Sequence, residues 1–168
     1  MSQKLPEKTD HRLMEVLLDE NSIMRCSRDI EHERNIAIYD LLESNHFELL
    51  KPGAHGPYSL KLALVNRRLA LHIGDSKGQP IQSIMLSLSA FRRLQKDYFL
   101  LCDSYFEAIK SAPPSRIEAI DMGRRSLHDE GAQLVIDRLS GKVRMDFETA
   151  RRLFTLICAL QGTGGARR

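Results

Sequence analysis

Three short runs of alternating apolar and polar residues, between positions 58 and 88, constrain the fold of this chain more than any other feature. In each run an apolar side chain, mostly leucine or isoleucine, occupies every second position. This period of two is typical of β-strands that have one buried face. The turn sequences Asn66-Arg67 and Asp75-Ser-Lys-Gly78 separate the runs, so we predict an antiparallel three-stranded meander.

Helical patterns dominate the sequence on both sides of this meander. We expect one helix over residues 29–44 and three more over 90–111, 115–139 and 147–160, with further short strands at 11–19 and 47–50. Strands grouped apart from helices indicate an α+β fold, in which helices cover a small antiparallel sheet and the C-terminal half is all helical. The helix over 90–111 is apolar on more than one side, which predicts a central position.

The composition predicts a cytoplasmic protein without a metal or cofactor. The length of 168 residues suits a single domain, placed at 1–160, followed by a flexible tail at 161–168. No apolar run approaches the roughly 20 residues that span a bilayer, and the polar N-terminus does not look like a secretory signal. Three widely spaced cysteines without a Cys-x-x-Cys pair favour reduced thiols and argue against a zinc site. The cysteines are Cys26, Cys102 and Cys158.

The helix predicted over 115–139 carries the strongest candidate for a functional site. Asp121, Arg124 and His128 lie within its apolar stripe, where a charged group is costly unless it is paired or bound. The first interpretation is an internal polar lock that joins this helix to its neighbours. The second is an anion-binding site, in which arginine supplies a two-pronged donor and a carboxylate orients the group. The residues of that site are Asp121, Arg124, Arg125, His128 and Glu130.

A second polar cluster, Glu31-His-Glu-Arg34, opens the first predicted helix. Its members Glu31, His32 and Arg34 could join the same site as acid, base or anion ligand. Adjacent helical residues point in different directions, and the His-Glu-x-x-His spacing of zinc enzymes is absent. The alternative is a helical first turn whose charges pair with one another.

The last predicted helix suggests contact with a second subunit. Apolar residues spread around much of its circumference, and Leu153, Leu156 and Leu160 are the predicted contacts of a homodimer. Arginine occurs in several pairs, but the net charge is only +3. This balance argues against a nucleic-acid binder.

Several long runs of residues are distinctive enough to be compared with known families. They are 29–34, Gly56-Pro-Tyr58, 90–93, 96–99, 117–125 with His128, and 149–158. These runs resemble an uncharacterised bacterial family of the UPF series, UPF0262. The resemblance covers about residues 12 to 160 and implies a small cytoplasmic bacterial protein, with no activity or catalytic residue to carry over.

From the residues themselves we expect a small interaction or regulatory module without catalysis. The alternative is an enzyme or sensor that binds an anion or phosphate ligand on the helix face of Asp121, Arg124, Arg125 and His128.

Overall fold

The computed structural model describes residues 10–23 and 28–161, with only the backbone described at 29 and 30. It confirms the α+β class. Cys26 and most of the predicted tail (162–168) lie outside the described residues, whereas Gln161 is the last residue of a helix. The elements in chain order are β1 (Leu13–Leu18), α1 (Arg28–Glu43), β2 (Phe47–Leu49), β3 (Tyr58–Val65), β4 (Arg68–Gly74), β5 (Pro80–Ser87), the 3₁₀ turn η1 (Ser89–Phe91), α2 (Arg92–Ser111), α3 (Pro114–Leu139), β6 (Val143–Met145) and α4 (Phe147–Gln161).

The predicted meander is confirmed as β3–β4–β5 within a four-stranded sheet of order β1-β3-β4-β5. Asn66 and Arg67 form the first turn, and both have positive φ, as a tight hairpin of matching twist requires. The prediction of a wholly antiparallel sheet is wrong, because β1 pairs parallel to β3. The chain passes through α1 and β2 between these strands, which is the long crossover that a parallel pair needs.

A second sheet joins two distant segments of the chain. Strand β2 pairs antiparallel with β6, so that Phe47 lies opposite Met145 and Leu49 opposite Val143. The expectation that the C-terminal half is all helical is therefore wrong at one place, because β6 lies between α3 and α4. This pair holds the end of α1 close to the start of α4.

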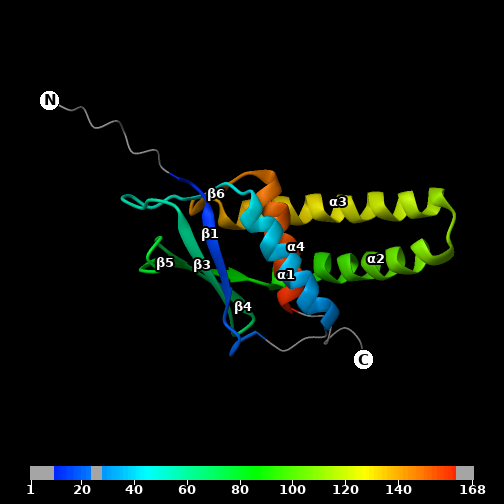
Figure 1. The fold of residues 1–168 in the computed structure, drawn as a ribbon, viewed down its shortest axis with the longest axis horizontal. Coiled ribbons are helices and arrows are strands. Elements are labelled where there is room, and N and C mark those ends of the chain that lie inside the picture. Colours follow the sequence, from blue (N-terminus) through cyan, green and yellow to red (C-terminus); the bar gives the residue numbers. More distant parts are fainter. Residues whose placement is uncertain (1–9, 24–27, 162–168) are drawn as a thin grey trace.

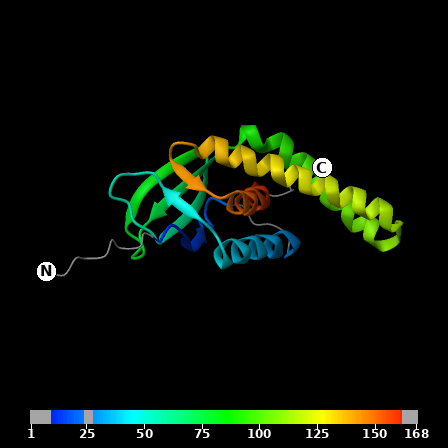
Figure 2. The ribbon, with the colours of Figure 1, turned by 90° about the horizontal axis from the view of Figure 1, so that it is seen from above.

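Helix α4 occupies the centre of the molecule, between α1 on one side and α3 on the other (Figures 1 and 2). Helices α2 and α3 pack against each other and project away from the sheet as a two-helix arm (Figure 1). The prediction that the helix over 90–111 is central is therefore wrong: only its first half reaches the core. No helix among the described residues is long and apolar enough to cross a membrane.

The predicted contacts of the last helix lie inside a single chain. Leu153, Leu156 and Leu160 are at most 2% exposed and belong to the main hydrophobic cluster. A side chain enclosed by its own fold cannot also cover a second folded subunit, so these leucines are wrong as the contacts of a homodimer. The apolar side chains around them come from α1, α3 and the sheet, which share the same hydrophobic cluster.

Candidate functional site

The predicted polar residues of α3 form a connected group where the arm leaves the body. Arg124 Nη2 donates to Asp121 Oδ1 at 2.7 Å, and Arg125 Nε lies 3.1 Å from Asp121 Oδ2. The Arg124 guanidinium also lies over the ring of Tyr105 in α2, with Cζ 4.4 Å from the ring centroid. Stacking of this kind adds a cation–π attraction to the ion pair. Arg124 is thus held between a carboxylate of its own helix and an aromatic ring of the neighbouring one.

His128 lies one helical turn further toward the body, among aromatic rings. Its ring centroid is 5.1 Å from that of Tyr98 in α2 and 6.4 Å from that of Phe154 in α4. Burial, followed by the positive charges of Arg151 and Arg124, lowers the pKa of His128 to about 4. The imidazole is therefore neutral near pH 7 and offers no positive charge to an anion. Its buried Nε2 has no hydrogen-bond partner within the part of the chain that the structure describes.

The arginines of α4 are held by nearby acceptors. Arg151 Nη1 donates to Glu148 at 3.1 Å, and its Nε lies 3.6 Å from Asp129 Oδ1. Arg152 donates to the carbonyl oxygen of Ser44 at the end of α1. These arginines contact the body of the protein as well as solvent, as expected of residues that join neighbouring elements.

The predicted α1 cluster divides into an exposed and a buried part. Glu31 and His32 are exposed, and no described contact brings them to Asp121 or His128. Arg34 is 7% exposed, and its guanidinium donates to the carbonyl oxygens of Ala159 (2.9 Å) and Leu160 (3.2 Å). Carbonyls in the last turn of a helix lack helical partners and carry partial negative charge. Arg34 therefore binds α1 to the C-terminal end of α4.

Four residues packed between α2 and α4 are not among the predicted site residues. They are Gln95, Tyr98, Cys102 and Phe154, and the rings of Tyr98 and Phe154 lie beside that of His128. The hydroxyl of Tyr98 hydrogen-bonds the thiol of Cys102, and Gln95 donates to the carbonyl of Cys158 at 3.4 Å. Burial raises the pKa of the Cys102 and Cys158 thiols, so neither is activated for attack. For the three residues of α2, the only signal in the sequence is that the helix over 90–111 is apolar on more than one side. For Phe154 the signal is the apolar spread around the last helix.

Glu130, the remaining predicted residue, is exposed on α3. The structure thus brings Asp121, Arg124, Arg125 and His128 together along one helix, without the α1 residues. In the described residues, His, Cys, Asp and Glu side chains form no group of three or more that could hold a metal ion. A shallow hollow of about 270 Å³ lies elsewhere, between the loop 51–55, Asp75 and Ile81, and Lys51 there donates to the carbonyl of Ile81.

Comparison with known proteins decides the family. The model of the Uncharacterised protein family (UPF0262) matches residues 10–163. The chain belongs to this family. A UPF0262 protein of Chelativorans sp. (strain BNC1) is 57% identical over 149 residues, which cover 89% of this chain and 92% of the relative. A UPF0262 protein of Rhodopseudomonas palustris (strain BisB18) is 53% identical over 98% of this chain and its own full length. No solved structure matches this UPF0262 chain.

Proposed function

We propose that this chain is a non-catalytic interaction module and that the outer part of the arm, residues 103–127, is its contact element. We call these residues the outer arm. The observation that carries the proposal is that the outer arm has almost no core of its own. Ala108 is its only buried residue, whereas Phe106 and Ile109 are each 50% exposed. Exposed apolar side chains that gather on one surface mark sites of protein contact.

Helical spacing places these side chains on a continuous stripe of α2. Cys102, Phe106 and Ile109 are four and three residues apart, so they share one side of the helix. Cys102 is buried and belongs to the same hydrophobic cluster as Cys158 of α4. The stripe therefore begins under α4 and continues onto the outer arm, which, in the described part of the chain, extends beyond α1 and α4 (Figure 2).

Helix α3 carries a matching stripe. His128 contacts Phe154 of α4, and Arg124, Asp121 and Ile117 follow it outward at steps of four, three and four residues. Because both stripes start beneath α4, they lie on the same side of the arm. We call this surface the arm face; it consists of Tyr105, Phe106, Ile109, Ile117, Asp121 and Arg124.

The chemistry of the arm face supports binding more than catalysis. Its arginine is already paired with Asp121 and stacked on Tyr105, and an anion would have to displace that carboxylate. The nearby imidazole is neutral and only partly exposed, and the thiols are buried. A surface of apolar side chains with one balanced ion pair is typical of a protein–protein contact.

The cytoplasm is the proposed compartment, and a protein rather than a nucleic acid is the proposed partner. Cys102 and Cys158 are buried free thiols, as expected under reducing conditions. The outer arm contains four acidic and four basic residues, so it lacks the positive excess that phosphate backbones require.

Photo-crosslinking in the native host tests this proposal. A photoreactive phenylalanine analogue at Phe106 should give discrete adducts of higher mass after irradiation, because this position lies on the arm face. The control is the same analogue at Met122, which is 64% exposed and, by helical spacing, points away from the arm face. Adducts that are absent at 106, or equally strong at 122, would contradict the proposal.

A further inference from the structure

We infer that the arm face binds a second copy of this chain, so that two arms form a four-helix bundle about a two-fold axis, with Asp121 and Arg124 of one copy facing Arg124 and Asp121 of the other. This inference rests on the proposed function of the outer arm and names its partner.

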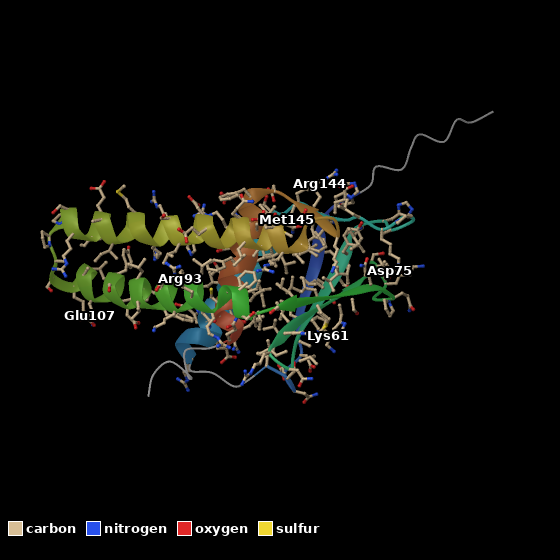
Figure 3. All side chains as sticks on the ribbon, turned by 180° about the vertical axis from the view of Figure 1, so that it is seen from behind. Lys61, Asp75, Arg93, Glu107, Arg144 and Met145 are labelled. Carbon is tan, nitrogen blue, oxygen red and sulfur yellow. The ribbon has the colours of Figure 1, made fainter. Side chains whose placement is uncertain are left out.

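The shape of the arm is the first reason. Helices α2 and α3 run antiparallel and side by side, joined by the tight connection at Ala112 and Pro113. Figure 3 shows them from behind, with Glu107 on the outer half of α2, far from Lys61 of β3 and from Asp75 in the turn between β4 and β5. Two antiparallel helices are half of a four-helix bundle. A two-fold axis brings two identical halves together and closes the assembly, since each copy offers the same surface to the other.

The apolar residues of the arm face are placed where such a bundle needs them. Phe106 and Ile109 come from α2, and Ile117 comes from α3. In a four-helix bundle, side chains of this kind fill the centre between facing helices. Among the described residues, α4 contacts the arm through ring contacts at Tyr98 and His128, whereas Phe106 and Ile109, further out, remain 50% exposed.

The charge of the outer arm is a further reason to propose that its partner is a second copy of this chain and not a different protein. Acidic residues of the outer arm are Asp103, Glu107, Glu118 and Asp121, and basic residues are Lys110, Arg116, Arg124 and Arg125. Four negative and four positive charges sum to zero, so two arms meet without net repulsion. A strongly acidic or basic partner would gain nothing from such a surface.

The ion pair on the arm face gives the contact its register. Asp121 and Arg124 are one helical turn apart, with their charged atoms 2.7 Å apart. An axis that passes between them places each negative group opposite a positive group of the other copy. The four charges then form a closed network at the centre of the interface, where paired charges fix orientation.

Sedimentation equilibrium of the full chain is the first test. The wild type should dimerise, and Phe106→Asp should weaken dimerisation at least about 30-fold, as loss of an aromatic contact at the centre of an interface does. Met122→Asp is the matched control and should change the dissociation constant by less than about threefold. Circular dichroism and thermal unfolding of each variant show that the monomer is folded. A wild type that stays monomeric at high concentration, or equal effects of the two variants, overturns the inference.

Reversal of the charge at Asp121 or Arg124 tests how the two copies are aligned along the arm. Asp121→Lys and Arg124→Glu should each weaken self-association, because each gives the arm face an excess of one sign. A mixture of the two variants should form a heterodimer more tightly than either variant forms a homodimer, since the excess charges are then opposite. No preference for the mixed species overturns the proposed pairing.

These tests separate the partner from the function. A monomeric wild type that still forms adducts at position 106 with another protein would refute the second copy and leave the interaction module standing. An absence of both dimer and adducts would refute both.

Discussion

Helix α4 and the outer arm use apolar side chains in opposite ways. Nine of the fifteen residues of α4 are buried, and they point in all directions around the helix. The outer arm is longer but buries only Ala108, and leaves apolar side chains on its surface. A helix that is apolar all round is enclosed by its own fold. The difference between the two regions indicates that the arm, with its exposed apolar side chains, is the part of the chain suited to contact another molecule.

Substitution by glutamate at one position in each region should give the largest difference in the free energy of unfolding. Leu156→Glu in α4 places a carboxylate at a side chain with 0% exposure, which should lower the free energy of unfolding by about 4 kcal/mol or more. Phe106→Glu on the outer arm should change the unfolding of the monomer by about 0.5 kcal/mol or less. Urea titration followed by circular dichroism, at protein concentrations below the dimer range, measures both values. Comparable losses for the two variants would remove the distinction between core helix and exposed arm.

Two glycines of α3 sharpen the comparison, because one faces the core and the other lies on the outer arm. A Cβ atom at Gly131 would lie 2.4 Å from ring atoms of Phe154, whereas at Gly123 it would meet Leu101 at an ordinary 3.6 Å. Gly131→Ala should therefore destabilise by about 1–3 kcal/mol through overpacking. Gly123→Ala should stabilise by about 0.5–1 kcal/mol, because alanine is the better helix former. Thermal and urea unfolding of both variants measure these opposite signs; two changes of the same sign would contradict the packing described.

His128, at the boundary of the two regions, gives an effect that depends on pH. Its pKa is lowered from 6.5 to about 4 in the folded chain. Between these pH values the unfolded chain binds more protons, so stability is fully present above pH 6.5 and falls as pH falls toward 4. The slope should be less than about 1.4 kcal/mol per pH unit, the limit for one proton, because the ring is partly exposed.

The control for this effect is His128→Gln, which does not titrate. Urea unfolding at pH 4.5, 5.5 and 7 should show a shallower decline for the variant than for the wild type. Identical pH profiles would mean that His128 is not buried in the way described.

The sequence predicted local structure well and distant contacts poorly. The meander and the helix over 115–139 follow from patterns that lie within short stretches of chain. Both are confirmed, the helix to within one residue at its start. The parallel pairing of β1 with β3 was missed because no local pattern specifies a partner about 45 residues away. The apolar spread of the last helix was interpreted as an interface, since a sequence does not say whether the covering surface belongs to the same chain.

Prediction of the candidate site was also local. Asp121, Arg124 and Arg125 could be joined from their spacing alone, and the ion pairs are present. Tyr105 beneath Arg124 and Phe154 beside His128 come from other helices. Nor could spacing reveal that Arg34 binds carbonyl oxygens 125 and 126 residues away.

The contact of Arg34 with Ala159 and Leu160 has a consequence for how the chain is made. The guanidinium belongs to α1, and its acceptors lie in α4, 125 and 126 residues later in the chain, so they leave the ribosome long after it. The meander and the arm can form earlier, because each needs only neighbouring sequence. A chain cut short before residue 159 leaves a buried positive charge without these acceptors, a costly state that exposes the unfinished body to proteases. The arginine thus makes synthesis of α4 through Leu160 a condition of a stable fold.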